Sequence, residues 1–278
     1  MSKKITYTTE VLLEGLKFPE SPRWHDDKLW FVDMELGKVL TVDLNGETET
    51  ILERNTPVSG LGWLPDNRLL VVSMADNRLL RLDSDGANVV ADLNKFGTVI
   101  CNDMVVDKKG RAYVGNFGFD YANGAPFRPT KLVIVNPNGD ARVVADNLAF
   151  PNGTVITPDD KTLIIAETFA ARLTAFDVID DGSLTNRRVW ANLKSLAPDG
   201  ICLDAEGGVW AAAPGSGRVI RALEGGEITH VVKVENDAYA CMLGGPDRKT
   251  LFVATSKHTR DAGRIEFVEV EIPGTGLP

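Results

Sequence analysis

The chain has 278 residues, of which 44% are hydrophobic and 25% are charged, and this is the composition of an ordinary globular protein. Asp and Glu total 39 against 30 Lys and Arg, so the net charge is −9. That balance argues against nucleic acid and membranes as partners, because both favour a basic surface. We expect one domain spanning residues 1–278, since all-β domains often reach this length.

The N-terminal segment MSKKITYTTE carries two lysines but no apolar stretch after them, so we expect no secretory signal. No apolar run elsewhere approaches the length of a membrane span. The three cysteines, Cys101, Cys202 and Cys241, are an odd number without CxxC spacing, which argues against a disulfide framework. These features predict a cytoplasmic protein in a reducing compartment.

Taken in chain order, the predicted strands repeat one pattern six times. Each copy has an apolar strand, a tight polar turn, a second apolar strand, a loop and an alternating third strand. Equivalent second-strand positions, separated by 40, 43, 51, 46 and 42 residues, are Leu29, Leu69, Ala112, Leu163, Val209 and Leu251. Repeats of about 40–50 residues with several strands each are typical of propeller blades. The sequence therefore predicts an all-β, six-bladed β-propeller.

A polar fourth strand follows in five of the copies, whereas the sixth copy runs out at Val270. The segment YTTEVLLEG near the N-terminus can supply the missing strand. We expect residues 5–14, approximately, to complete the last blade, so that the N-terminal strand closes the ring and removes its open edge. A propeller closed in this way needs no obligate protein partner to fold.

One position of the repeat carries an oxygen-bearing side chain in most blades. Nine to eleven residues before the second-strand positions stand Glu20, Ser59, Asn102, Asn152, Asp199 and Cys241. The innermost strands of a propeller line its central channel, so we expect these six side chains to converge at one mouth of it. In three copies, FPESP, FPNGT and APDGI, a proline precedes the polar residue and restricts the backbone before it.

The carboxylates of Glu20 and Asp199, with amide oxygens from Asn152 and Asn102, make an oxygen-only set that suits Ca²⁺, Mg²⁺ or Mn²⁺. None of the three histidines falls on the ring, which excludes a His-rich zinc site. Asp, Asn and Ser are also common turn residues, but their shared register in the repeat favours a metal site. Asp103 is expected to point to the opposite face by strand alternation and to be structural.

The motifs FPESPRW, CNDMVVDKKGRAYVG, FPNGT and APDGICLD occur in this order. With them, the sequence resembles the gluconolactonase/senescence marker protein (regucalcin) family over essentially the whole chain. The resemblance implies a six-bladed propeller that holds one divalent cation and hydrolyses lactones. It also implies Glu20, Asn152 and Asp199 as metal ligands, with Asn102 as a ligand or substrate contact. Calcium is the leading expectation for the ion, with zinc, magnesium, manganese and iron as alternatives.

The substrate pocket departs from the family pattern. Members that act on sugar lactones often carry Arg two residues before the Asn of the ND motif, and this chain has Ile100 there. Apolar side chains in the loops of the first three blades are Met34, Met74, Phe117, Phe119 and Phe150. These residues predict a less polar lactone or ester as the substrate.

The longest connection between strands, residues 116–130, lies on the same side as the ligand ring. Long loops in compact domains often serve as lids or binding loops. Its rings, Phe117, Phe119, Tyr121 and Phe127, are expected to form an apolar wall, or alternatively to pack the loop onto its blade. His258 of the last blade is also on this side, where it either relays a proton or is simply solvated.

The expected reaction uses the metal as a Lewis acid on the lactone carbonyl, with Asp199 as the general base for the attacking water. In the alternative, Asp199 is a ligand only and metal-bound hydroxide attacks unaided. We predict that Asp199 and Asn102 are the catalytic residues. Cys241 has no base near it in sequence, and no GxSxG motif occurs, which argues against a thiol or serine nucleophile.

The leading prediction is a divalent-metal-dependent hydrolase that opens a lactone or related ester, so the partner is a small molecule. Two other functions stay open: a phosphotriesterase-type hydrolase, and a non-catalytic propeller that binds calcium or a protein partner. A ligand ring beside an apolar wall favours an active site over a flat docking face.

Overall fold

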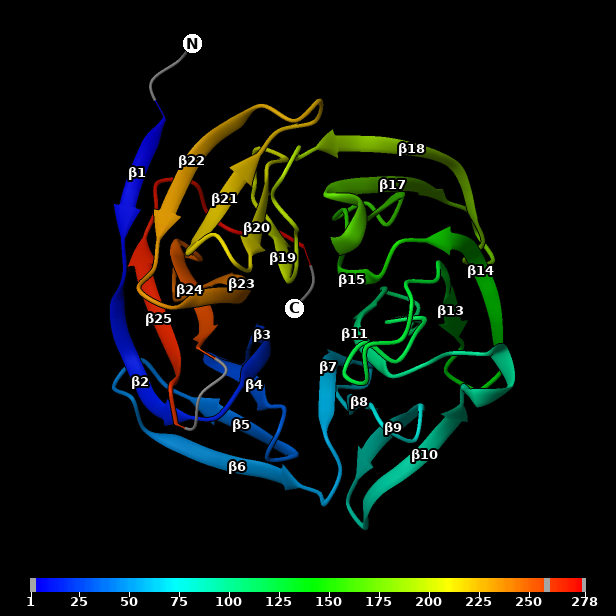
Figure 1. Cartoon of the computed structure of the whole chain (residues 1–278). Coiled ribbons are helices and arrows are strands. Elements are labelled where there is room, and N and C mark those ends of the chain that lie inside the picture. Colours follow the sequence, from blue (N-terminus) through cyan, green and yellow to red (C-terminus); the bar gives the residue numbers. More distant parts are fainter. Residues whose placement is uncertain (1–3, 258–260, 277–278) are drawn as a thin grey trace.

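The computed structural model describes residues 4–257 and 261–276. Six β-sheets stand around a central channel as the blades of a propeller (Figure 1). In the first five blades, four strands run from the channel to the rim in chain order, so each sequence repeat forms one blade. The predicted all-β, six-bladed β-propeller is therefore confirmed.

The innermost strands line the channel. In blade order they are β3 (Pro19–His25), β7 (Val58–Trp63), β11 (Cys101–Val106), β15 (Pro151–Ile156), β19 (Ile201–Leu203) and β23 (Asp237–Gly244). The second strands are β4 (Lys28–Asp33), β8 (Leu69–Ser73), β12 (Ala112–Asn116), β16 (Thr162–Glu167), β20 (Val209–Ala213) and β24 (Thr250–Ser256). These contain the apolar, β-branched segments that the sequence pattern marks as buried.

The outer strands are more polar. The third strands are β5 (Lys38–Val42), β9 (Arg78–Asp83), β13 (Thr130–Val135), β17 (Arg172–Val178), β21 (Arg218–Ala222) and β25 (Gly263–Glu269). The rim strands are β6 (Thr48–Glu53), β10 (Gly86–Asp92), β14 (Ala141–Leu148), β18 (Leu184–Asn192), β22 (Ile228–Lys233) and, from the N-terminal segment, β2 (Glu10–Leu16). Two short 3₁₀ turns complete the elements, η1 (Asn94–Phe96) and η2 (Thr168–Ala170).

The N-terminal segment closes the ring, as predicted, but its two halves join different blades. Strand β2 pairs antiparallel with β25 and supplies the fourth strand of the last blade. Strand β1 (Ile5–Thr8) instead pairs in parallel with β22 and adds a fifth strand to the fifth blade. The prediction that residues 5–14 all belong to the last blade is therefore wrong for residues 5–8.

The contacts of Tyr7 account for this difference. Its ring stacks on His230 of β22 at a centroid distance of 6.2 Å, and its hydroxyl donates to the Glu271 carboxylate. The last blade needs only residues 10–16 to complete its sheet, so the preceding residues are free to cover the edge of β22. Alternation alone does not reveal which sheet a strand will join, because it marks the buried face of a strand and not its partner.

Apolar clusters fill the spaces between neighbouring blades. All five residues of β8, β12 and β20 are buried. The cluster between the second and third blades joins side chains such as Leu70 and Val72 with Val114 and Val133. Each second strand is covered on both faces, which explains its near-continuous apolar sequence.

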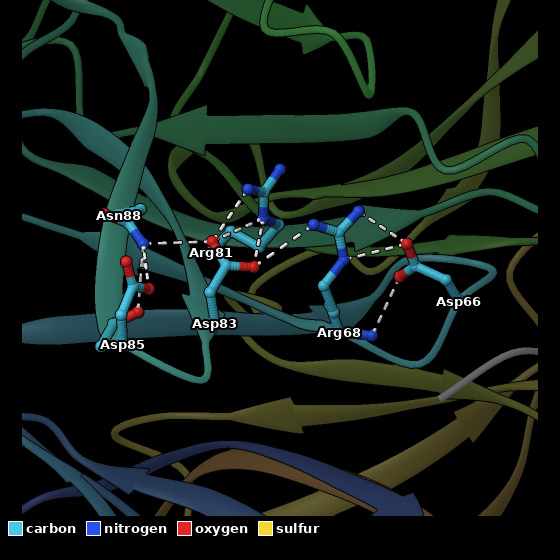
Figure 2. Close-up of polar contacts among 7 residues, drawn as sticks. Asp66, Arg68, Arg81, Asp83, Asp85 and Asn88 are labelled. Atoms are coloured by element: carbon cyan, nitrogen blue, oxygen red, sulfur yellow. Dashed lines mark hydrogen bonds and ion pairs between the residues drawn. The ribbon is translucent and has the colours of Figure 1, made fainter.

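A polar network on the surface of the second blade joins β9 and β10 to the turn before β8 (Figure 2). The Asp83 carboxylate accepts bonds from Arg81 at 2.8 Å and from Asn88 at 3.2 Å, and Arg68 joins it to Asp66. The hydrogen bond from Arg81 lowers the pKa of Asp83 to about 2. Every charged group in this exposed network has a partner, so we interpret the network as part of the surface structure and not as a functional site.

The innermost strands share an irregularity near the channel mouth. In β11, Cys101 and Met104 are three residues apart, yet they pair with Asn116 and Val114, which are two apart. The same kind of register shift interrupts β3, β7, β15 and β23. Each shift is a β-bulge, an extra residue that breaks the alternation of the strand and re-aims the side chains beside it.

Glycine at the bulge of β15 lets neighbouring inner strands touch without a side chain between them. A Cβ atom on Gly153 would lie 2.6 Å from the backbone nitrogen of Ile201, and one on Gly200 would lie 2.6 Å from the Cα of Ala240. The backbone N–H of Gly200 also donates to the Tyr239 carbonyl at 2.8 Å. These close approaches bring the fourth, fifth and sixth blades together at the mouth.

The Gly153→Ala substitution is expected to lower the free energy of unfolding by about 1–3 kcal/mol, because the new methyl group overpacks the backbone of residues 199–201. Thermal and urea unfolding measure the loss. Gly207→Ala is the matched control, since Gly207 has open space around a Cβ position and only its positive φ opposes alanine. An equal or smaller loss at Gly153 than at Gly207 would contradict the packing argument.

Candidate metal centre

A chain of hydrogen bonds joins the polar residues of four neighbouring blades. The Ser59 hydroxyl donates to Oδ1 of Asn102 at 3.2 Å, and Nδ2 of Asn102 donates to Oδ1 of Asn152 at 2.9 Å. The Asn152 side chain in turn hydrogen-bonds Asp199. The structure thus brings together the polar residues predicted for blades two to five, and Asn102, Asn152 and Asp199 are each at most 9% exposed.

Thr168 holds Asn152 in this arrangement. Its hydroxyl accepts a hydrogen bond from Nδ2 of Asn152 at 3.2 Å and donates one to the Pro198 carbonyl at 2.8 Å. Thr168 begins η2, in the connection after β16, and Pro198 immediately precedes Asp199. One hydroxyl therefore links two of the predicted ligand positions, and its residue lies outside the repeat register that predicts them.

Glu20 contributes a buried carboxylate from the first blade. Its Oε2 accepts the backbone N–H of Ser21 at 2.8 Å. Burial raises the pKa of Glu20 to about 8, with a further contribution from the negative charge of Asp103. The hydrogen bond from Ser21 and the positive charge of Arg23 oppose that shift without cancelling it. The protein therefore holds this carboxylate where ionisation is unfavourable without a cation.

Ionisation of the buried Asp199 carboxyl is unfavourable as well. Burial raises its pKa well above the ordinary value, the charges of Glu20 and Asp103 raise it further, and the hydrogen bond from Asn152 lowers it. The two carboxylates belong to the first and fifth blades, so the ring of the propeller brings them to one place. In the described part of the chain, neither forms an ion pair with a basic side chain.

Asp103 lies on the channel side, contrary to the prediction that it faces away. Its Oδ1 accepts a hydrogen bond from Arg23 at 2.7 Å, and the Ser21 hydroxyl lies 3.4 Å from the same atom. The bulge in β11 explains the error, because alternation fails between Cys101 and Met104. Asp103 forms a buried ion pair with Arg23, and both side chains are 8% exposed.

The charges of the centre match a divalent cation. Glu20, Asp199 and Asp103 bring three negative charges when ionised, and Arg23 brings one positive charge, which leaves a net −2. A buried surplus of this size is costly unless a cation offsets it. Among the described residues, no group of three or more His, Cys, Asp or Glu side chains could hold a metal, so the ligands would have to include amide oxygens.

The donor set fits a hard cation. Glu20 and Asp199 offer carboxylate oxygens, and Asn152 and Asn102 offer amide oxygens beside them. Ca²⁺ takes carboxylates and Asn side-chain carbonyls together. In the present hydrogen-bond pattern, Oδ1 of Asn152 accepts from Asn102, and this acceptor is the atom that would turn to a cation.

Cys241 was predicted to belong to the ring of six side chains at the channel mouth, but its thiol is buried in the core. Its thiol lies 3.5 Å from the Trp210 carbonyl and 3.7 Å from the Gly200 carbonyl, inside an apolar cluster. Burial raises the pKa of this thiol well above its usual range, which keeps it protonated and makes it a poor nucleophile.

Tyr239 of the sixth blade lies near the two carboxylates and is not at the predicted register position. It sits in the bulge of β23 between Ala238 and Ala240. Burial raises its pKa, and the negative charges of Asp199 and Glu20 add to the shift, which places the phenol within their electrostatic reach. No pattern in the sequence marks this position, because the bulge breaks the alternation of β23 there.

The predicted substrate pocket is only partly assembled. Phe117 stacks on Phe150 at a centroid distance of 4.0 Å, and Phe119 is 7% exposed beneath the same loop. Ile100 is half-buried at the entry to β11 with a φ of +54°. Met34 instead packs against the core between the first and second blades. His258 lies outside the described residues.

Phe169 joins this aromatic group from the fourth blade and was not predicted. Its ring lies 5.4 Å from Phe150 and 5.6 Å from Phe119. It follows Thr168 in η2, so it is one residue from the side chain that holds Asn152. No repeat register connects this turn with the loop of the third blade, and therefore only the folded chain reveals the contact.

The whole propeller matches one family. A sequence model of the SMP-30/Gluconolactonase/LRE-like region matches residues 18–257. The chain belongs to this family. The assignment predicted from the four motifs is therefore confirmed, and the family name includes an enzyme that hydrolyses a lactone ester. In the described part of the chain, no helix is long and apolar enough to cross a membrane.

Members of the family resemble the chain over nearly its full length. Regucalcin of Bos taurus is 27% identical over 91% of this chain and 87% of its own. Pentonolactonase XacC of Haloferax volcanii is 26% identical over 97% of this chain and 96% of its own. The relationship thus extends over nearly the whole chain.

Solved structures share the fold. A calcium-binding regucalcin from Agrobacterium tumefaciens superposes with a TM-score of 0.84 at 20% identity, covering 99% of both chains. A gluconolactonase from Xanthomonas campestris superposes with a TM-score of 0.75 at 23% identity, covering 95% of this chain and 89% of its own. At these identities the likeness establishes the six-bladed architecture.

Proposed function

We propose that the protein is a divalent-metal-dependent hydrolase that opens a lactone or related ester ring. The observation that carries this proposal is the buried pair of carboxylates, Glu20 and Asp199, beside amide oxygens at the mouth of the channel. Pentonolactonase XacC and the Xanthomonas campestris gluconolactonase act on lactones by their names, which supports this reaction class.

Glu20, Asn152, Asp199 and Asn102 would hold the ion. We favour calcium, because the donors are hard oxygens and a regucalcin of the same fold is described as calcium-binding. Zinc, magnesium, manganese and iron are the alternatives. A bound divalent cation would supply Lewis-acid polarisation of the ester carbonyl.

The side chains of the centre have separate tasks in hydrolysis. The Asp199 carboxylate would accept a proton from a water molecule as the water oxygen attacks the carbonyl carbon. The bond from that carbon to the ring oxygen then breaks, and the ring oxygen takes up a proton, giving an open hydroxy acid. Asn102, whose side chain lies beside Asn152, would orient the substrate or complete the ligand set.

The Arg23–Asp103 ion pair is buried beside the two carboxylates and holds this arrangement in place. Arg23 donates to the Pro22 and Met104 carbonyls at 2.9 Å each, so its guanidinium crosses between the first and third blades. Its position fixes Asp103, whose charge acts on both Glu20 and Asp199. We assign the pair a positioning role.

The cytoplasmic location and the single-domain organisation stay predictions.

Metal removal tests the proposal. We expect chelator-treated protein to lose lactone opening and to regain it when one divalent ion, calcium first, is added back. Proton release across a panel of alkyl, aryl and sugar lactones measures the activity, and a phosphotriester is included as a competing substrate class. Absence of lactone opening with every ion would contradict the proposal, and hydrolysis of the phosphotriester alone would replace it with the phosphotriesterase alternative.

A further inference from the structure

An apolar hollow opens beside the candidate metal centre. We call it the aromatic groove, and its lining is formed by Phe119, Tyr121, Gly124, Ala125, Phe127 and Phe169. The hollow has a volume of about 370 Å³. Its walls come from the connection between β12 and β13 and from η2, and Figure 1 shows that connection coiled beside β11. None of the described side chains that line it is charged.

The rings of the groove are exposed although they are gathered together. Tyr121 is 59% exposed, Phe127 is 51% exposed and Phe169 is 45% exposed. The Phe169 ring lies 5.8 Å from Tyr121 and 5.9 Å from Phe127, and the buried Phe119 forms the floor. Packing the loop onto its blade would require buried rings, so the exposure of three rings calls for another reason. Clustered exposed apolar side chains mark binding sites more often than scattered ones do.

The groove is joined to the metal centre by short links of chain. Phe169 follows Thr168, whose hydroxyl accepts the hydrogen bond from Asn152. The Phe150 ring lies 5.4 Å, centroid to centroid, from the Phe169 ring of the groove. Phe150 stands only two residues before Asn152. Consecutive Cα atoms are about 3.8 Å apart, so Phe150 and Asn152 lie within about 8 Å of each other. A molecule held at the centre can therefore reach the groove.

Tyr121 joins the groove to the ring pair beside the centre. Its ring stacks on Phe117 at a centroid distance of 6.3 Å, and Phe117 stacks on Phe150 at 4.0 Å. Because Phe150 stands two residues before Asn152, these stacked rings lead from the groove toward the centre.

We propose that the aromatic groove binds an alkyl chain carried by the lactone, which places the substrate class among alkyl-substituted lactones rather than sugar lactones. The inference rests on the proposed function. The volume lies within the range of small-molecule pockets, and such pockets are lined mainly by apolar and aromatic side chains. Ile100, half-buried at the entry to β11, adds no group that would bind a sugar hydroxyl.

Selectivity between two lactones tests the groove. The ratio of kcat/KM for γ-decalactone, which carries a hexyl chain, to that for γ-butyrolactone, which carries none, is measured on calcium-loaded protein. We expect Phe169→Ala and Phe127→Ala each to lower this ratio by about tenfold, mainly through KM for γ-decalactone, because contacts to the chain are lost. An unchanged ratio in both variants would overturn the proposal.

Val189→Ala is the matched control. Val189 is 55% exposed on β18, at the rim and outside the groove, so its truncation removes a comparable exposed apolar side chain. We expect this variant to keep the wild-type ratio. A fall equal to that of Phe169→Ala would show a general effect of truncation and would count against the groove. Thermal unfolding of all three variants checks that each is folded.

Binding of an unreactive analogue separates the groove from the reaction. The lactam analogues of the two lactones are titrated onto calcium-loaded protein and followed by ligand-observed NMR. We expect the hexyl-substituted lactam to bind at least about tenfold more tightly than the unsubstituted one, and Phe169→Ala to remove the difference. No gain from the chain would overturn the groove proposal, whereas failure of lactone opening with this gain intact would overturn only the proposed function.

Discussion

Replacing Asp199 with alanine is expected to abolish the binding of a divalent ion and the opening of lactones together. The substitution removes one of the two buried carboxylates and the partner of Asn152. Loss of partners outside the ligand set already costs about 10–100-fold in metal affinity or activity, so loss of a ligand should cost at least about 100-fold in both. Isothermal titration with calcium and proton release from a lactone measure the two effects.

The Asp199→Asn substitution separates the two roles assigned to this residue. Asparagine keeps an oxygen that can contact a cation but has no carboxylate to take a proton from water. If Asp199 is the general base, the variant binds calcium more weakly and turns over no lactone even at saturating calcium. Substantial turnover at saturating calcium would show that Asp199 acts only as a ligand.

Asp85→Ala provides the matched control for removal of an aspartate. Asp85 lies in the exposed polar network of the second blade, where it accepts a hydrogen bond from Asn88 at 2.9 Å (Figure 2). We expect calcium binding and turnover to match the wild type. Full lactone opening by Asp199→Ala, with Asp85→Ala equally active, would rule out both the metal-ligand role and the base role of Asp199.

The fold was predictable because the same pattern of apolar strands recurs in each copy of the repeat. Six copies with similar spacing require six similar sheets, and second strands apolar on both faces require blades on both sides. The destination of the first strand was not predictable in the same way. Tyr7 places β1 against β22 through contacts with His230 and Glu271, and those residues are more than two hundred positions away.

The site was predictable to the extent that it follows the repeat register. Ser59, Asn102, Asn152 and Asp199 occupy equivalent positions, and the structure joins them through side-chain hydrogen bonds. The errors arise where the bulges interrupt alternation. Asp103 therefore faces the channel.

The same limit applies to the sixth blade and to the aromatic groove. Tyr239, in place of Cys241, approaches the carboxylates because a bulge falls between two alanines. Phe169 reaches Phe119 and Tyr121 from a different blade, through a turn of three residues that has no counterpart in the repeat. Contacts between irregular segments of different blades depend on the closed ring, which periodicity does not describe.

The stability of metal-free protein is expected to fall as the pH rises from about 4.5 to about 8. Burial raises the pKa of Glu20 from an ordinary 4.5 to about 8. Between these values the folded protein holds a proton that the unfolded chain has released, so folding is favoured at the acid end and loses that contribution as the pH rises. Asp199 acts in the same direction, because its pKa is also raised.

A divalent ion should remove this dependence. The cation takes the place of the protons and favours the ionised carboxylates, so binding is weak near pH 5 and strengthens toward about pH 8. We expect the increase in melting temperature caused by saturating calcium to be small near pH 5 and large near pH 8. The difference corresponds to a free energy on the order of a few kcal/mol. Differential scanning calorimetry at both pH values, with and without calcium, measures it.

The Glu20→Gln variant tests the assignment of this effect to the metal centre. Glutamine is neutral at every pH, so the metal-free variant should lose much of the decline in stability above about pH 5, and calcium should stabilise it far less than the wild type. Glu14→Gln, at an exposed position of β2, is the control and should behave as the wild type does. Equal calcium stabilisation at both pH values, or an unchanged calcium effect in Glu20→Gln, would mean that the buried carboxylates are not where the ion binds. The opposite result would tie the unfavourable burial of Glu20 to its use, because a charge that destabilises the empty centre is the same charge that draws the cation into it.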